Sequence, residues 1–149
     1  MTNAATTPAG TPQRPLPEPT PETRPYWEAA REGRLLVQRC NACGHRQFYP
    51  RRICTRCLSE DLGWIEASGR GTIYTFTVTH RAAGPAFEPL VPYVCAIIEL
   101  EEGVRMLSNI IDCDPAQLRI GQRVQVDFLQ LSPEIALPVF RPLADAEGR

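Results

Sequence analysis

Four cysteines in the first half of the chain are spaced as two metal-binding turns. Two residues separate Cys40 from Cys43, two separate Cys54 from Cys57, and ten lie between the pairs. Each such turn brings two sulfurs close enough for one ion, and two facing turns complete a tetrahedral site of four thiolates. A site of this kind has no open position for water. We therefore predict a structural zinc site of the zinc-ribbon type, which holds the fold together.

The same cysteines fit three other uses. Disulfides would need an oxidising compartment, and the chain shows no basic start followed by an apolar run of the kind that directs secretion. A rubredoxin-like iron site uses the same four thiolates, so spacing alone does not separate iron from zinc. A thioredoxin-like redox pair would need one such turn opening a helix. Cys95 and Cys113 lie in separate apolar runs and are expected in the core, and His45 is expected near the metal without binding it.

The basic residues are unevenly distributed. All 16 of them are arginines, so chemistry that needs a lysine Schiff base is excluded for this chain acting alone. Residues 31–57, which contain the four cysteines, hold seven arginines against the single acid Glu32. Residues 58–149 hold seven arginines against 13 acids. The metal-binding half is therefore basic and the rest of the chain is acidic.

The elements that position the cysteines are predicted to be mostly β. Pro25 and Gly33 bound a short helix, and the ribbon runs from there to Glu66. Beyond Glu66, β-branched and aromatic residues alternate with polar ones in short runs. Five strands are expected, at residues 72–79, 93–100, 104–111, 123–128 and 137–142, with a helical turn at residues 114–117. The last strand is expected at a sheet edge because it contains prolines, and the whole is compatible with a five-stranded OB-fold barrel.

These elements divide the chain into four segments. Residues 1–24 are rich in proline and are predicted to be a disordered or polyproline-like tail. Residues 25–66 form the helix and the ribbon, residues 67–142 the OB-fold domain, and residues 143–149 a C-terminal tail. No apolar run approaches the roughly 20 residues of a membrane span. We expect a cytoplasmic protein that is not bound to a membrane.

Five motifs, taken in order, resemble those of a known family. They are Pro-Tyr-Trp-Glu-Ala-Ala-Arg-Glu-Gly-Arg-Leu, Gln-Arg-Cys-Asn-Ala-Cys-Gly-His, Cys-Thr-Arg-Cys, Gly-Arg-Gly-Thr-Ile-Tyr-Thr-Phe-Thr and Pro-Tyr-Val-Cys-Ala-Ile-Ile-Glu-Leu. Together they closely resemble the zinc-ribbon/OB-fold acyl-CoA-associated family, which was long catalogued as a domain of unknown function. The resemblance covers residues 25–142 and implies an N-terminal helix, a rubredoxin-like zinc ribbon and a C-terminal OB fold.

The resemblance also implies a function. Members of the family are typically small partner subunits of thiolase-fold enzymes, either thiolases or related acyl-CoA lyases and aldolases. Some occur beside or fused to hydratase domains in steroid, fatty-acid or aromatic degradation. The implied role is a non-catalytic accessory subunit in a hetero-oligomer, which binds or channels acyl-CoA. The chain itself shows no catalytic constellation, since His80 has no serine or cysteine beside it.

Several residues are candidates for binding CoA or the partner. Guanidinium groups can bind phosphates bidentately, and aromatic rings can contact the adenine or the pantetheine arm. A solvated or partner-facing surface is the alternative for the arginines, and barrel core the alternative for the rings. Tyr26 and Trp27 are candidate partner anchors, or they pack against their own ribbon. The CoA candidates are Arg46, Arg51, Arg52, Arg70, Phe87 and Tyr93.

Two other functions remain compatible with a ribbon joined to an OB fold. Such proteins can bind single-stranded nucleic acid, but the acidic balance of residues 58–149 argues against it, because backbone binding needs clustered positive charge. An iron-loaded ribbon would instead transfer electrons.

Overall fold

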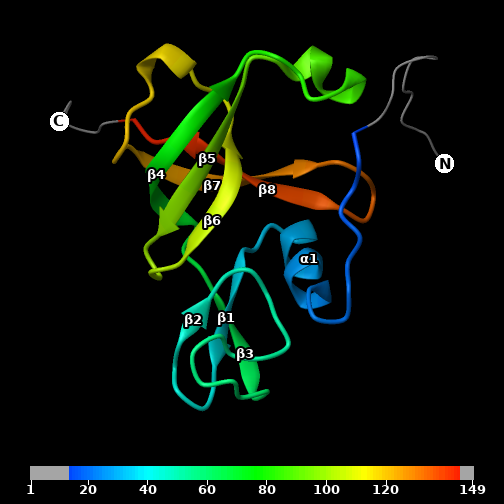
Figure 1. The fold of residues 1–149 in the computed structure, drawn as a ribbon, viewed down its shortest axis with the longest axis vertical. Coiled ribbons are helices and arrows are strands. Elements are labelled where there is room, and N and C mark those ends of the chain that lie inside the picture. The colour runs from blue at the N-terminus through cyan, green and yellow to red at the C-terminus, as the bar shows by residue number, and fades with distance from the viewer. Residues whose placement is uncertain (1–13, 145–149) are drawn as a thin grey trace.

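The computed structural model describes residues 14–144, and these form a ribbon with one α-helix and a closed β-barrel (Figure 1). The predicted tails lie partly outside the described residues. The helix α1 (Arg24–Arg31) and the strands β1 (Leu36–Cys40), β2 (Arg46–Gln47) and β3 (Leu62–Glu66) form the ribbon part. The barrel comprises β4 (Arg70–Thr79), β5 (Tyr93–Leu100), β6 (Arg105–Ile110), β7 (Arg123–Gln130) and β8 (Ala136–Pro142), with short 3-10 helices η1 (Pro85–Leu90) and η2 (Pro115–Gln117).

Helix α1 begins and ends where its sequence predicts. Pro25 occupies the first turn, where its missing N–H is not needed. Gly33 has a φ of +82°, and its N–H donates to the carbonyl of Ala30 at 3.0 Å. The buried face consists of Tyr26, Ala29 and Ala30. The helix lies against β1, β7 and β8, so it joins the ribbon to the barrel.

The ribbon is a three-stranded antiparallel sheet in the order β2-β1-β3. Strand β1 is central, and its Val37 is fully buried. Val37 belongs to one continuous core that also contains Tyr26 and the inner residues of the barrel. Ribbon and barrel are therefore packed on each other rather than joined only by a linker.

The barrel strands run in the order β4-β5-β6-β8-β7. Strand β5 shows why the sequence specifies this arrangement: Val94, Ala96, Ile98 and Leu100 are buried, while the residues between them are partly exposed. This period of two places one face of the strand in the core. The prediction of a mostly β chain with a five-stranded OB-fold barrel is confirmed.

The prediction that the last strand lies at an edge is wrong. Strand β8 pairs with β7 along its length and with β6 at Ile110 and Phe140, and so closes the barrel. The Phe140 carbonyl accepts the N–H of Ile111 at 2.8 Å and so contributes to this closure. Pro138 and Pro142 lie two residues before and after Phe140, so their backbone groups point to the same side of β8, toward β6. Strands β6 and β8 pair only at Ile110 and Phe140. The missing proline N–H groups therefore break no long ladder.

The loop predicted at residues 81–92 contains the helix η1, which the sequence did not indicate. The turn predicted at residues 114–117 is present as η2, and its Asp114 side chain accepts the N–H of Ala116 at 3.0 Å. Over residues 14–144 no helix is both long enough and apolar enough to cross a membrane.

A polar joint connects the ribbon to the turn between β5 and β6. Ser68 donates its N–H to the Glu102 carboxylate at 2.9 Å and its hydroxyl to Glu101 at 3.0 Å. Arg46 donates to the Glu102 carbonyl at 3.2 Å. Arg70 pairs with Glu101 at 3.2 Å, and these contacts lower the pKa of Glu101, with the Ser68 hydrogen bond as the main cause.

We predict that Gly71→Ala destabilises the barrel. A Cβ at position 71 would lie 2.4 Å from the Glu99 carbonyl oxygen on the paired strand, closer than real Cβ contacts. We expect the free energy of unfolding to fall by about 2 kcal/mol, measured by urea denaturation. Gly84→Ala is the matched control, because its Cβ would have no neighbour within 4 Å. Equal stability of the two variants would contradict the prediction.

Candidate functional site

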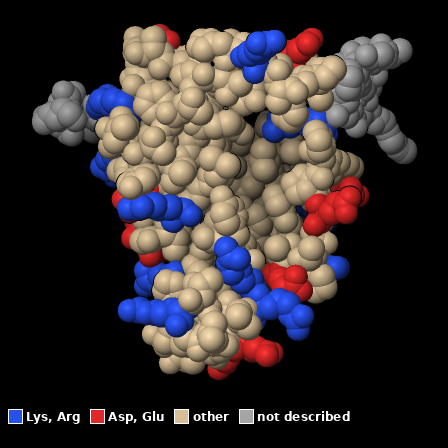
Figure 2. Space-filling view, viewed as in Figure 1, with Lys and Arg blue, Asp and Glu red and all other residues tan. Residues whose placement is uncertain are grey.

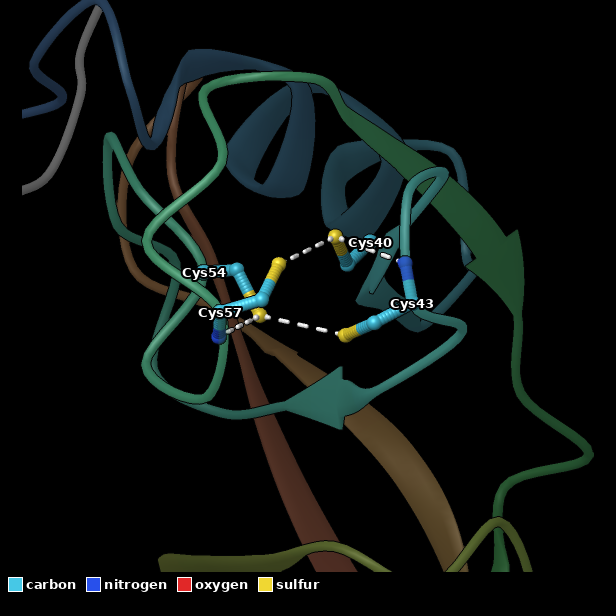
Figure 3. Close-up of side chains that lie close together, drawn as sticks. All are labelled: Cys40, Cys43, Cys54 and Cys57. Carbon is cyan, nitrogen blue, oxygen red and sulfur yellow. Dashed lines mark hydrogen bonds between the residues drawn. The ribbon is translucent and has the colours of Figure 1, made fainter.

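The four predicted ligands converge in the ribbon (Figure 3). Their sulfur atoms all lie within 4.8 Å of one another. The Sγ atoms of Cys40 and Cys57 are 3.6 Å apart, and those of Cys43 and Cys54 are 3.7 Å apart. Disulfides would need about 2.05 Å, so the cysteines are not bonded to each other. Cys40 and Cys54 are buried, and the other two are exposed.

This geometry fits zinc. A tetrahedral ion with bonds of about 2.3 Å to sulfur requires sulfurs about 3.8 Å apart, close to the two separations found here. The donor set consists of four thiolates, which structural zinc sites use. When bound, the ion would cross-link the two turns and leave no position for water or substrate. The ribbon therefore contains a structural metal site rather than a catalytic one.

The backbone prepares both turns for thiolates. Cys40 Sγ accepts the N–H groups two and three residues further on, at 3.3 and 3.4 Å. Cys54 Sγ accepts the equivalent pair at the same distances. Burial opposes ionisation of Cys54, but these N–H groups outweigh it and lower its pKa to about 6. At Cys57 the Ser59 backbone favours the thiolate, yet burial and the other sulfurs raise the pKa to about 12. The four thiols thus lose some of their protons readily, but ionisation of all four requires a bound cation.

Two buried glutamines fix the second turn, and the sequence analysis missed them. Gln47 donates from Nε2 to Gln38 Oε1 at 2.8 Å, and its own Oε1 accepts the N–H of Thr55 at 2.9 Å. Gln38 binds both backbone groups of Arg51 at 2.8 Å. The loop that carries Arg51 and the second pair of cysteines is thereby tied to the sheet. The signal in the sequence was a polar residue at a strand position expected to be buried, because buried polar groups need hydrogen-bond partners.

An apolar cavity of about 610 Å³ lies at one end of the barrel. Phe87 of η1 and Tyr93 of β5 line it, with their ring centroids 6.3 Å apart. The Arg14 guanidinium lies 5.8 Å from the Phe87 ring and borders the same cavity. Both predicted aromatic residues are therefore beside a cavity and not in the barrel core. Leu90, Ile110, Leu129 and Val139 supply apolar wall.

An aromatic groove of about 340 Å³ adjoins the apolar cavity. Cys95 and Asn109, which are paired across β5 and β6, line both spaces. The groove runs between the barrel and the ribbon, and its aromatic wall is formed by Tyr26, Trp27, Phe48 and Tyr49. The cysteine predicted to be buried in the core, Cys95, thus lies partly exposed at the junction of two hollows.

A basic cleft of about 450 Å³ shares the lining residue Phe48 with the groove. It lies between the ribbon and the β5–β6 turn, and Arg46, Arg51 and Arg105 border it. Arg105 stacks 3.7 Å from the Tyr74 ring and pairs with Glu99 at 3.2 Å. Figure 2 shows a hollow on this face whose walls carry few charges, with arginines gathered toward the ribbon.

The remaining predicted residues lie elsewhere. Arg52 is exposed and borders none of these three spaces, and Arg70 is engaged in the joint with Glu101. Tyr26 is only 6% exposed and packs edge-on against Trp27 and Phe48. Burial raises its pKa, with a further contribution from Tyr49. Tyr26 thus packs within its own chain, as the alternative prediction held, while partly exposed Trp27 remains a candidate partner contact.

The surroundings of the other titratable candidates do not indicate catalysis. His80 is exposed at the end of β4, and His45 is half-buried at the rim of the basic cleft. Cys113 borders the apolar cavity, where burial raises the pKa of its thiol. None of these residues is placed as a nucleophile beside a base.

The sequence matches two family profiles in tandem. Residues 27–63 match the rubredoxin-like zinc ribbon domain of ChsH2, and residues 64–129 match the C-terminal OB-fold domain of ChsH2. The chain belongs to this family. The two matches meet within β3, between Gly63 and Trp64, close to the boundary between ribbon and barrel.

Solved and curated relatives extend this assignment. A chain of the solved "Ltp2-ChsH2(DUF35) aldolase" is 40% identical, with a TM-score of 0.78, and the match covers 85% of this chain and 98% of that one. A DUF35 domain-containing scaffold protein of Methanocaldococcus jannaschii is 39% identical over 110 residues, 72% of this chain and 77% of that protein. This chain therefore shares its ribbon and OB-fold architecture with a DUF35 protein of known structure.

Two further relatives carry enzyme-subunit names. A probable enoyl-CoA hydratase alpha subunit of Thermomonospora curvata is 40% identical over 134 residues, 90% of this chain but 41% of that protein. The benzoylsuccinyl-CoA thiolase subunit BbsA of Geobacter metallireducens is 32% identical over 77 residues, 51% of this chain and 49% of that protein. The chain spans less than half the length of the hydratase subunit, and its match with BbsA covers about half of each chain.

We predict that Cys54→Ser abolishes stoichiometric zinc binding and unfolds the ribbon. Structural zinc contributes on the order of 10 kcal/mol to folding in small metal domains. We expect one zinc per wild-type chain by elemental analysis, released on acidification because protons compete for the sulfurs. NMR spectra of the variant should lose the ribbon signals. Cys113→Ser is the control and should retain zinc; a red, iron-loaded wild-type protein would contradict the zinc assignment.

Proposed function

We propose that this chain is a non-catalytic accessory subunit of a thiolase-fold enzyme, either a thiolase or an acyl-CoA lyase or aldolase. In this role it docks on the enzyme and helps to bind or channel acyl-CoA during degradation of steroids, fatty acids or aromatic compounds. The partner supplies the catalytic residues, and the assembly is a hetero-oligomer that can include a hydratase-like subunit.

The names of the relatives support the partner class. One matched chain comes from an aldolase assembly, one relative is a thiolase subunit, and one is a hydratase alpha subunit. The scaffold name of the Methanocaldococcus relative supports a role in holding other chains together. A metal site with four thiolates and no open position supports a role that is not catalytic.

The arrangement of the three hollows supports acyl-CoA as the ligand, and this observation carries the proposal. The basic cleft and the aromatic groove share the lining residue Phe48, and the groove and the apolar cavity share Cys95 and Asn109, so the three hollows are neighbours in that order. Acyl-CoA has the same order of chemistry: phosphates, a pantetheine arm and an acyl group.

Each hollow has groups suited to its part of the ligand. In the basic cleft, Arg46 and Arg51 can bind phosphate oxygens. Along the groove, Ser108 and Asn109 provide polar groups beside the aromatic wall, as the amides of pantetheine require. The apolar cavity, at about 610 Å³, lies within the roughly 300–1,000 Å³ of ligand sites. An acyl group held there would be shielded from water.

The thiols support a cytoplasmic location for this assembly. The described cysteines are all free, and four of them are arranged for a metal. Reduced thiols of this kind persist where glutathione and thioredoxin are active.

We predict that the chain forms a stable complex with a thiolase-fold enzyme of the same organism. Co-expression of the two, with a tag on this chain alone, should yield both proteins in one peak on size exclusion. Acyl-CoA cleavage by the enzyme should fall at least about tenfold, or about 1.4 kcal/mol in transition-state free energy, when this chain is left out. Full activity of the enzyme alone, or separate elution of the two proteins, would contradict the proposal.

We predict that replacing Arg46 and Arg51 together by Gln weakens acyl-CoA binding about tenfold, because two phosphate contacts are lost. Isothermal titration of the complex with acyl-CoA measures the change. Arg81→Gln is the control, since Arg81 is exposed and borders none of the three hollows. An unchanged affinity of the double variant would remove the basic cleft from the ligand site.

A further inference from the structure

The two metal-binding turns have the same backbone hydrogen bonds, but different residues follow their last cysteines. The N–H that follows the first turn, at Gly44, donates to the Cys40 carbonyl at 2.9 Å. The N–H that follows the second turn, at Leu58, donates to the Cys54 carbonyl at 2.9 Å. Gly44 has a φ of +81° and Leu58 a φ of +67°. Leucine therefore stands where the first turn uses glycine.

Leucine is a poor choice for this backbone. In the left-handed region the Cβ of an ordinary residue approaches the following carbonyl oxygen, so glycine or asparagine is normally found there. Burial of the side chain could compensate, but Leu58 is 68% exposed, the highest value of any large hydrophobic residue in the described part of the chain. The exposed Leu58 side chain therefore adds little packing energy to the isolated chain.

Leu58 belongs to a mixed patch on the outer surface of the second turn. We define this knuckle tip by Arg52, Ile53, Arg56 and Leu58. Ile53 is 39% exposed, and both arginines are exposed. Neither arginine forms an ion pair with a carboxylate among residues 14–144. The tip therefore presents two aliphatic side chains and two guanidinium groups that have no acidic partner among residues 14–144.

We propose that the knuckle tip is a docking contact for the thiolase-fold partner, which receives Leu58 and Ile53 in an apolar pocket rimmed by carboxylates. This rests on the proposed function. Residues that dominate interfaces are desolvated in pockets of the partner, and arginine is enriched among them. Carboxylates around the pocket would pair with Arg52 and Arg56 and steer association. The same charges argue against a second copy of this chain, because two tips would bring four guanidinium groups together.

The zinc site positions the tip. Cys54 and Cys57 flank Arg56, and Leu58 follows directly, so the ion and the Gln38–Gln47 pair fix the backbone that carries the patch. A contact held in one conformation loses little entropy on binding. In this proposal the bound metal keeps the knuckle tip in the conformation that contacts the partner.

The test compares Leu58→Asn with Ile120→Asn in the full chain. Asparagine tolerates the left-handed backbone, so Leu58→Asn should leave the thermal midpoint of the isolated chain unchanged or raise it by about 2–4 °C. The dissociation constant of the complex with the co-expressed enzyme, measured by surface plasmon resonance, should rise about tenfold. Ile120 is the matched control: it is 67% exposed on the barrel, and its substitution should change the constant less than twofold. Arg56→Gln should slow association and reduce its salt dependence.

Each other outcome overturns the proposal in a recognisable way. An unchanged dissociation constant for Leu58→Asn removes the tip from the interface, and equal weakening by Ile120→Asn makes the effect nonspecific. A lower thermal midpoint or faster zinc release to a chelator assigns Leu58 to the ribbon's own stability. Loss of self-association in place of partner binding assigns the tip to a second copy of this chain. If the wild-type chain forms no complex with the enzyme, the proposed function fails, and this occupant of the tip fails with it.

Discussion

Four sulfur atoms within 4.8 Å of one another can all be ionised only around a cation. The ribbon depends on that constraint, because its sheet is small: β2 has two residues, and β1 and β3 have five each. The second turn belongs to no strand and is held by the metal site and by Gln38 and Gln47. Metal charge and a buried amide pair therefore take the place of a larger hydrophobic core. Arg51 and the knuckle tip inherit their positions from this arrangement.

The candidate ligand site depends in turn on the packing of ribbon against barrel. A single core runs from Val37 of the ribbon to Phe140 of the barrel, and α1 contacts both parts. The aromatic groove and the basic cleft lie along the seam between the two parts, which explains why each takes residues from both. A ribbon or a barrel alone would provide only part of the wall. Fusion of two small modules has thus created a surface that neither has by itself.

The sequence predicted what is encoded locally. Cysteine spacing specified the metal site, and alternation in residues 93–100 matched β5 at both ends. Features that depend on distant neighbours were not accessible: the prolines of β8 suggested an edge because the short parallel pairing with β6 is invisible in sequence. Arg70 and Arg46 looked equivalent by charge, yet Arg70 is paired with the Glu101 carboxylate, whereas Arg46 donates to a backbone carbonyl and borders the cleft. The buried pair of Gln38 and Gln47 was missed because the side chains bond to each other and to Arg51 and Thr55, which lie in a loop whose position the sequence does not show.

The closure of the barrel by β8 has a consequence for the order in which the chain can fold. All four metal ligands lie within residues 40–57, so the ribbon is complete early in synthesis, as the chain leaves the ribosome from its N-terminus. The barrel must wait for residues 136–142, since β7 gains its main partner and β6 its second neighbour only then. Helix α1 packs against both β7 and β8. The helix can therefore pack against β1 early, whereas its contacts with the barrel form only after β8 has been made.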